Sequence, residues 1–234
     1  MSANRSILVT GASSGIGKAI SNKLLDEGHE IFGIGRRFTN DTPHKSFHPY
    51  SIDLSDLETL CTKLTPFIHV DTIICNAGKG HFAHLEEFSY TQICSLLDLN
   101  FLSHVYIIKT LLPHLKKKEH ADIIFIGSEA GLSGQKKGSI YSASKFALRG
   151  FAQSLREECR TSGVRVSIIQ PGLVRTPFYD TLSFTPGSEE TQAIEPEDIA
   201  ETISYILRMR KGTICDEIIL SPHKKVIEKN KPIA

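Results

Sequence analysis

The sequence predicts an α/β fold of the Rossmann-like, doubly wound type, in which helices cover both faces of a parallel sheet of about seven strands. Short apolar runs of strand length alternate with longer segments of helical period along the chain. Runs such as DIIFI and VRVSIIQ are nearly continuous in apolar residues, as expected of strands that are covered on both faces. We find no internal repeat, low-complexity tract or linker, so a single domain over residues 1–234 is expected.

The expected elements follow one another as strand and helix. Strands are predicted over residues 6–9, 30–34, 45–52, 72–75, 122–126, 165–170 and 217–220, which are segments of strand length. Helices are predicted near residues 16–27, 56–64, 91–117, 141–159 and 197–209, where apolar residues recur with helical period. Because strands joined in this way form a parallel sheet with right-handed crossovers, a ligand is expected at the carboxyl ends of the strands.

Composition narrows the class of partner. The chain has 234 residues, a formal net charge of +1 and 40% hydrophobic residues, which is enough for one well-buried core. So balanced a charge gives no electrostatic reason to expect nucleic acid or a membrane as a partner. The five cysteines show no CxxC spacing, which suits reduced thiols in the cytoplasm. The start enters a strand-like run at once, and no apolar stretch is long enough to span a bilayer, so we expect a cytoplasmic protein without a signal peptide.

Residues 178–195, here called the lid segment, are the least regular part of the sequence and are rich in Thr, Ser, Pro and Gly. A loop this long in a compact domain is usually functional or else disordered, so we expect a substrate lid near 178–195. Its apolar residues suggest an apolar acyl or ring-bearing substrate: Phe178, Tyr179, Leu182 and Phe184.

The glycine-rich stretch TGASSGIG, residues 10–17, follows the first strand and opens a helix. Gly11 permits a tight turn, Gly15 leaves room for a pyrophosphate near the helix N-terminus, and Gly17 allows the helix to pack closely on the strand. The spacing GxxxGxG departs from the common GxGxxG. Its place between a strand and a helix favours nucleotide binding over a purely structural turn.

The second strand ends in Arg36 and Arg37, with Gly35 at the position where dinucleotide folds usually keep an acid for the adenosine ribose. Two guanidinium groups are suited to a ribose phosphate, because they form forked, charge-assisted hydrogen bonds. The alternative is a solvated arginine pair at a strand end. The missing acid favours NADP(H) over NAD(H) as the cofactor.

Several further motifs occur in order along the chain: Asp53-Leu54, Asn76-Ala77-Gly78, Asn100, Ser128, Tyr141 with Lys145, and Pro171-Gly172 followed by Val174 and Thr176. With the glycine loop, they make the sequence resemble the classical short-chain dehydrogenase/reductase family from residue 7 to about residue 220. The resemblance implies a catalytic tetrad of Asn100, Ser128, Tyr141 and Lys145. It also implies an NADP(H) site formed by Gly11, Ser13, Ser14, Gly15, Ile16, Gly17, Arg36, Arg37, Asp53, Leu54, Asn76, Ala77, Gly78, Tyr141, Lys145, Pro171, Gly172, Val174 and Thr176.

The pair Tyr141 and Lys145 has a physical reading as well. Residues four apart lie on one face of a helix, so the two side chains can reach a common point. A free phenol titrates near pH 10, and lowering its pKa to about 7 requires roughly 4 kcal/mol. An ammonium group about 4 Å away supplies a similar amount at an effective dielectric constant of roughly 20. We therefore expect Tyr141 to be the proton donor, with its pKa lowered by Lys145.

The other two members of the tetrad have supporting roles. Ser128 follows a buried strand and is placed to polarise a carbonyl and share its developing charge. By resemblance, Asn100 holds a water molecule that continues a proton relay to Lys145. The alternative for Asn100 is a side chain bonded to local backbone.

These expectations combine into an oxidoreductase of the carbonyl reductase/alcohol dehydrogenase type, which transfers a hydride between NADP(H) and a carbonyl or alcohol. The alternative is a non-catalytic NADP(H)-binding regulatory protein on the same fold. No metal is expected, because no complete ligand set accompanies His81 and His84.

By resemblance we expect a homodimer, with a tetramer as the alternative. The chain ends EIILSPHKKVIEKNKPIA, without the glycine-rich contact through which many relatives assemble. The helical stripe of Phe101, Val105, Ile108 and Leu112 fits either a dimer interface or core packing.

Overall fold

The computed structural model describes residues 4–38 and 44–230, so the remainder of the predicted domain 1–234 lies outside the described residues. A seven-stranded parallel sheet has the order β3-β2-β1-β4-β5-β6-β8. Its strands are β1 (Ser6–Thr10), β2 (Glu30–Gly35), β3 (Phe47–Ser51), β4 (Thr72–Cys75), β5 (Ala121–Ile126), β6 (Val164–Pro171) and β8 (Glu217–Leu220). The predicted Rossmann-like fold is confirmed, and β4 and β8 have the predicted bounds.

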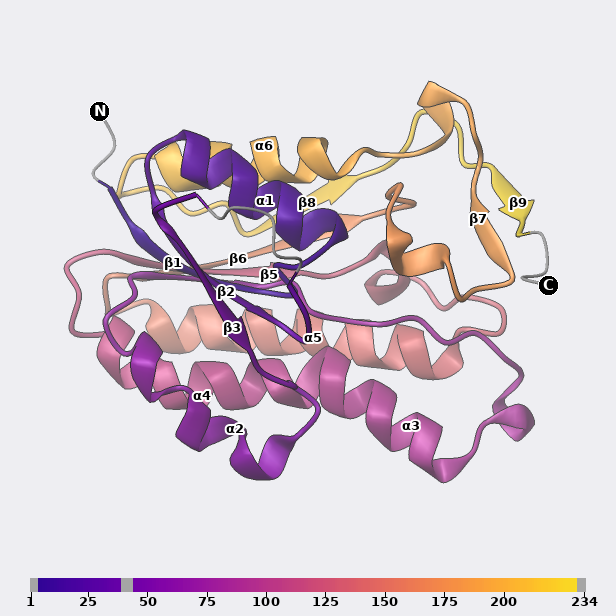
Figure 1. Ribbon diagram of the computed structural model, residues 1–234, viewed down its shortest axis with the longest axis horizontal. Helices are drawn as coiled ribbons and strands as arrows, with labels where there is room; N and C mark the ends of the chain where they lie inside the picture. The colour runs from indigo at the N-terminus through magenta and orange to yellow at the C-terminus, as the bar shows by residue number, and fades with distance from the viewer. Residues whose placement is uncertain (1–3, 39–43, 231–234) are drawn as a thin grey trace.

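Helices cover both faces of this sheet (Figure 1). One face carries α1 (Gly15–Asp26) and α6 (Pro196–Arg208), and the other carries α2 (Leu57–Lys63), α4 (Ser103–Leu115) and α5 (Ser139–Cys159). Successive residues of β1 divide between the two cores: Ile7 and Val9 pack with α1 and α6, whereas Leu8 packs with α2, α4 and α5. This alternation explains why the strands are apolar on both sides. Among the described residues, we find no helix that is both long enough and apolar enough to cross a membrane.

The helix predicted over residues 91–117 is interrupted. The chain forms α3 (Tyr90–Leu97), a π-helical turn (Asp98–Leu102) and then α4. The expectation of one continuous helix is therefore wrong at this point. Asn100, the only fully buried residue in the turn, bonds to the backbone of Lys79 rather than to its own helix. Such π-turns are often found at functional sites.

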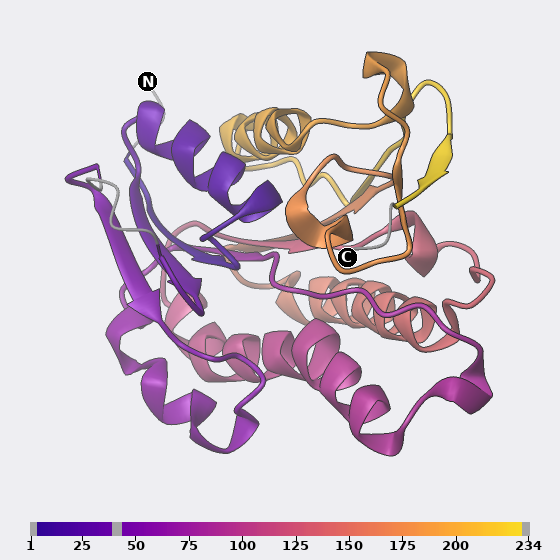
Figure 2. The same cartoon turned by 45° about the vertical axis from the view of Figure 1, so that its right-hand side comes forward.

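The lid segment contains structure that the sequence did not predict. Short 3-10 turns occur at Pro177–Tyr179 and Glu190–Gln192, and β7 (Phe184–Pro186) pairs with β9 (Ile227–Lys229) in an antiparallel ribbon. Figure 2 shows this ribbon beside the carboxyl edge of the main sheet. A three-residue strand is too short to carry a periodic sequence signal, so both strands escaped prediction.

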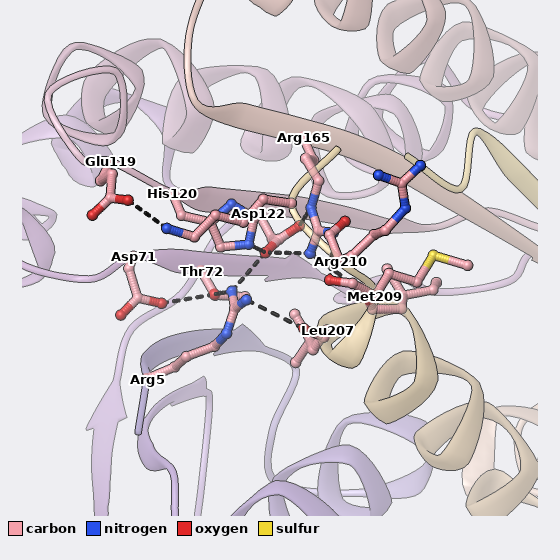
Figure 3. A network of polar contacts seen from close by, with 12 residues as sticks. Arg5, Asp71, Thr72, Glu119, His120, Asp122, Arg165, Leu207, Met209 and Arg210 are labelled. Carbon is pink, nitrogen blue, oxygen red and sulfur yellow. Dashed lines mark hydrogen bonds and ion pairs between the residues drawn. The ribbon is translucent and has the colours of Figure 1, made fainter. Parts of the chain in front are cut away.

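A buried ionic network occupies the opposite, amino-terminal edge of the sheet (Figure 3). Asp122, 1% exposed, accepts hydrogen bonds from Arg5 at 2.5 Å and from Arg165 at 2.7 and 3.0 Å. Arg165 also donates to the carbonyl oxygens of Met209 and Thr213, each at 3.2 Å. The network thus joins β1, β5 and β6 to the chain that follows α6, on the edge remote from the expected ligand.

Candidate functional site

A cavity of about 830 Å³ opens at the carboxyl edge of the sheet, where the strand order reverses between β1 and β4. This position and volume suit a small-molecule cofactor and its substrate. The predicted site residues that line it are Gly11, Ser13, Ser14, Gly15, Ile16, Arg36, Asp53, Leu54, Asn76, Ala77, Gly78, Ser128, Tyr141, Lys145, Pro171, Gly172, Val174 and Thr176. Gly17, Arg37 and Asn100 lie outside this lining.

The glycine loop has the geometry of an anion cradle. Gly11 and Gly15 have φ values of +69° and +50°, a conformation that favours glycine. A Cβ atom on Gly17 would lie 2.2 Å from the carbonyl oxygen of Gly11, so only glycine fits there. Ser14, the N-cap residue of α1, makes no side-chain hydrogen bond to the helix. The first amides of α1 have no intrahelical acceptor, and they lie at the cavity wall, where they fit a pyrophosphate.

Thr10 and Asn76 fix this loop against the turn that follows β4. The Thr10 hydroxyl accepts hydrogen bonds from the backbone N–H groups of Asn76 at 2.9 Å and Ala77 at 3.0 Å. The Asn76 side chain donates to the Thr10 carbonyl oxygen at 2.9 Å. Because β1 and β4 are neighbours, the two turns form one continuous wall of the cavity.

Beyond β2, a second pocket of about 520 Å³ is lined by Ser13, Arg36, Arg37, Ser51 and Asp53. Both arginines are exposed, and no ion pair joins them to residues 4–38 or 44–230. Asp53 accepts hydrogen bonds from the Ser55 side chain at 2.6 Å and backbone N–H at 2.9 Å, which lower its pKa below the usual value. This pocket therefore presents two guanidinium groups to an anion, with the Asp53 carboxylate already engaged by Ser55.

Three members of the predicted tetrad meet in the cavity. Tyr141 and Lys145 lie on α5 and are 9% and 5% exposed. Ser128 is the second residue after the end of β5. The Ser128 hydroxyl lies near the Tyr141 phenol and acts to lower its pKa. The Lys145 ammonium nitrogen donates to the Ile126 carbonyl oxygen at 3.1 Å and lies 5.9 Å from the centre of the Tyr141 ring. An acid, a hydrogen-bond donor and a cation are thus gathered at one edge of the sheet.

Burial has the largest effect on the pKa values of Tyr141 and Lys145. It raises the pKa of Tyr141 to about 12, against the smaller opposing effect of the nearby Ser128 hydroxyl. Burial also lowers the pKa of Lys145 to about 8. The prediction that Lys145 brings the pKa of Tyr141 to about 7 is therefore wrong for this structure. The enclosed site disfavours the phenolate, and the ammonium group is turned toward the Ile126 carbonyl oxygen.

Asn100 lies behind the cavity wall, fully buried in the π-helical turn. Its side-chain oxygen accepts from the Lys79 N–H, and its amide donates to the Lys79 carbonyl oxygen, both at 2.9 Å. Asn100 therefore bonds to backbone, as its alternative role predicted, but that backbone is 21 residues away in the sequence and not local. A Cβ atom on Gly78 would lie 3.3 Å from the Asn100 oxygen and 3.8 Å from the Lys145 nitrogen, so the three groups are close neighbours.

Sequence reasoning missed Gln170, which positions Ser128. Its side-chain oxygen accepts from the Ser128 N–H at 2.7 Å, and its amide donates to Glu217 at 2.9 Å. Gln170 is fully buried in β6. A polar residue within the apolar run VRVSIIQ, just before Pro171, was the available signal, because a buried amide needs polar partners.

His104 was also missed. It is fully buried on α4, and its Nε2 lies 2.9 Å from the Ala77 carbonyl oxygen, so it supports the turn after β4. Its Nδ1 is buried without a hydrogen-bond partner among the described residues. Burial lowers the pKa of His104 to about 4, with the positive charge of Lys145 acting in the same direction.

We expect His104 to make the protein less stable in acid. Its pKa is 6.5 in an unfolded chain and about 4 in the fold, so the unfolded state binds the proton first. Its contribution is fully present above pH 6.5 and is lost as pH falls toward 4, by about 3 kcal/mol in total. Urea unfolding measured across this pH range tests the expectation. His104→Gln keeps a donor for Ala77 but cannot titrate, so an equally steep pH dependence in that variant would contradict it.

Aromatic side chains lie beside the Tyr141 ring in the cavity. Phe82 lies 5.1 Å from both the Tyr141 and the Phe184 rings, and Phe178 lies 6.1 Å from Tyr141, measured between ring centres. Lys225 and Ile227, close to the end of the described chain, also line the cavity and were not predicted. In the described part of the chain, no group of three or more His, Cys, Asp and Glu side chains is placed to hold a metal ion.

Comparison with known proteins adds independent information. A family model described as short chain dehydrogenase matches residues 5–185. An uncharacterised oxidoreductase of Staphylococcus epidermidis is 29% identical over 224 residues, which cover 92% of this chain and 96% of that protein. The 17-beta-hydroxysteroid dehydrogenase type 1 of Mus musculus is 30% identical over 197 residues, covering 77% of this chain and 57% of that protein. An alcohol dehydrogenase of Thermococcus sibiricus, solved with 5-hydroxy-NADP, has a TM-score of 0.83 at 24% identity, with 95% of this chain and 98% of that chain covered.

Proposed function

This chain is an oxidoreductase of the short-chain dehydrogenase family, and from that premise we propose that it transfers a hydride between NADP(H) and a carbonyl or alcohol substrate. The observation that carries the proposal is the meeting of Ser128, Tyr141 and Lys145 in the same cavity as the glycine loop. The aromatic residues beside Tyr141 favour an apolar acyl or ring-bearing substrate. The NADP-bound structures among proteins of this fold support the choice of cofactor.

The residues present fit a nicotinamide dinucleotide. The α1 amides and the glycine loop would hold its pyrophosphate, and Arg36 and Arg37 its ribose phosphate. Asp53, Leu54 and the turn Asn76-Ala77-Gly78 would enclose the adenosine, and the segment from Pro171 to Thr176 the nicotinamide. Lys145 has donor capacity beyond its bond to Ile126, which suits the ribose hydroxyls. When bound, the dinucleotide supplies or accepts the hydride.

The side chains of this protein manage the proton and the charge. During reduction, Tyr141 donates its proton to the carbonyl oxygen, and the Ser128 hydroxyl donates a hydrogen bond to the same oxygen. The raised pKa of Tyr141 keeps the phenol protonated at neutral pH, so it is ready to act as an acid. The Lys145 ammonium, 5.9 Å from the centre of the Tyr141 ring, is the positive charge available to the phenolate that remains after the proton has left. Asn100 and Gln170 position the surrounding backbone.

A panel of aldehydes and ketones tests this function in the presence of NADPH, with loss of NADPH absorbance as the measurement. We expect turnover of at least one apolar or aromatic carbonyl compound. The alternative, a regulatory protein that binds NADP(H) without catalysis, predicts saturable NADPH binding and no oxidation with any compound. Saturable binding without turnover across the panel would therefore favour the regulator.

Replacing Arg36 and Arg37 together by Ala is expected to raise the KM for NADPH by about ten- to a hundredfold, because charge-assisted hydrogen bonds contribute about 1.5–3 kcal/mol. The KM for NADH should change by less than about twofold, since that cofactor lacks the ribose phosphate. Steady-state kinetics with both cofactors gives the comparison. Arg160→Ala, an exposed arginine on another surface, is the matched control. Equal losses for NADPH and NADH would remove the phosphate-binding role.

We also propose a homodimer in the cytoplasm, with a tetramer as the alternative assembly. The five cysteines are unpaired, which supports a reducing compartment. Of the predicted helical stripe, Ile108 is 1% exposed and belongs to the core, which favours core packing there over an interface. Phe146 on α5 and Ile219 on the edge strand β8 remain exposed and suit a second copy of the chain. Sedimentation velocity distinguishes the assemblies.

A further inference from the structure

Residues 224–230, here called the C-terminal strap, run along the lid segment and bind it at several points. The Lys224 N–H donates to the Thr191 carbonyl oxygen at 2.8 Å, and the Gly187 N–H donates to the Val226 carbonyl oxygen at 3.1 Å. The next residues of the strap form β9, which pairs with β7. The pairing joins two segments about forty residues apart along the chain, and Figure 1 shows them side by side.

Asn230 fastens the end of the strap. Its backbone N–H donates to the Ser183 carbonyl oxygen at 3.1 Å. Its side-chain amide lies within hydrogen-bond distance of the carbonyl oxygens of Tyr179 and Leu182, both at 2.8 Å, and of Phe184 at 3.3 Å. Two N–H groups therefore serve three acceptors. The Asn230 side chain thus binds the turn between Tyr179 and β7 at three carbonyl oxygens. An alanine at this position would remove the hydrogen-bond donor for all three.

The turn that Asn230 holds carries the aromatic wall of the cavity. The Tyr179 ring lies 5.2 Å from Phe178 and 5.7 Å from Phe184, and Phe184 lies 5.1 Å from Phe82. Phe82 and Phe178 in turn contact the Tyr141 ring. A shift of the backbone at 179–184 would therefore displace the wall next to the proposed proton donor.

The strap also contributes side chains to the cavity. Ile227 is 57% exposed although it is apolar, and it lines the cavity, so an apolar ligand would cover it. The Lys225 ammonium lies 2.9 Å from a carboxylate oxygen of Glu129, which directly follows Ser128. This pair ties the strap to the rim of the proposed catalytic group.

We infer that the C-terminal strap determines substrate selectivity, an inference that rests on the proposed function. Asn230 fixes the lid segment so that Phe178 and Phe184 form one wall of an apolar pocket, and Ile227, on the same face of the β7–β9 ribbon as Phe184, extends that wall. The pocket so formed favours carbonyl compounds that bear a ring or a bulky apolar group over small aliphatic aldehydes. Asn230 is a positioning residue, because it acts through the backbone of the lid segment.

Asn230→Ala in the full chain tests the inference by two measurements. Hydrogen–deuterium exchange should increase in the amides of residues 179–187 and remain unchanged in β1 and β4. The preference for a ring-bearing ketone over a short aliphatic aldehyde, taken as the ratio of kcat/KM values with NADPH, should fall about tenfold. The KM for NADPH should stay within about twofold, since Asn230 does not line the cavity and is not among the proposed cofactor contacts.

Lys225→Ala and Lys224→Ala form a matched pair for the rim contact. Lys224 is adjacent on the strap, and only its backbone bonds to the lid segment, so its variant should behave as wild type. Lys225→Ala should lower the same preference by about threefold. An unchanged preference in Asn230→Ala, with or without increased exchange, overturns the inference. If the wild type reduces no carbonyl compound, the proposed function fails. The exchange measurement does not depend on activity, so unchanged exchange in Asn230→Ala would show on its own that Asn230 does not stabilise the lid segment.

Discussion

Tyr141→Phe is expected to lower kcat for carbonyl reduction by about 10²- to 10⁴-fold, the range contributed by a general acid. The substitution removes only the hydroxyl group, so the ring contacts with Phe82 and Phe178 remain. Lys145 keeps its bond to the Ile126 carbonyl oxygen, and NADPH should therefore bind with nearly unchanged affinity. Stopped-flow measurement of NADPH oxidation, beside fluorescence titration of NADPH binding, separates the chemical step from cofactor binding.

Tyr106→Phe is the control for this experiment. Tyr106 lies on α4, packs against the core and does not line the cavity, so its variant loses the same atom without a catalytic effect. If Tyr141→Phe turns over a substrate as fast as Tyr106→Phe does, Tyr141 is not the proton donor. A loss of NADPH binding equal to the loss of kcat would instead assign Tyr141 to cofactor binding.

Local sequence signals were enough to place the main groups. The glycine loop and the turn Asn76-Ala77-Gly78 directly follow strands, and the carboxyl ends of parallel strands meet at one edge. Tyr141 and Lys145 share a helix face because of their spacing. Each inference needed only contacts within one element or between neighbouring strands, and the structure brings these groups to the same cavity.

The features that sequence reasoning missed depend on distant contacts. β9 exists because it pairs with β7, and Asn230 matters because of carbonyl oxygens some fifty residues earlier in the chain. The break at Asn100 likewise depends on Lys79, and no pattern within residues 91–117 reveals it. The pKa of Tyr141 was misjudged because the attraction of a nearby cation can be read from spacing, whereas the cost of burial requires the packed structure.

The second large effect concerns stability rather than catalysis. Asp122→Asn is expected to lower the free energy of unfolding by about 3–5 kcal/mol, the usual cost of removing one partner of a buried ion pair. Asp122 is the carboxylate shared by Arg5 and Arg165, and Arg165 is itself 4% exposed. An asparagine keeps the shape but leaves two guanidinium groups without a balancing charge (Figure 3).

Urea unfolding of the full chain measures this loss. Asp26→Asn, an exposed acid at the end of α1, should change the free energy of unfolding by less than about 0.5 kcal/mol and serves as the control. Replacing Asp122 and Arg165 together by apolar residues should lower the free energy of unfolding by less than the sum of the two single substitutions. In the double variant, only Arg5 is left without its charged partner. Strict additivity would show that the two side chains do not interact.

Because the network lies at the amino edge of the sheet, the folded Asp122→Asn protein should retain the wild-type KM for NADPH. A raised KM would mean that the two edges of the sheet are coupled.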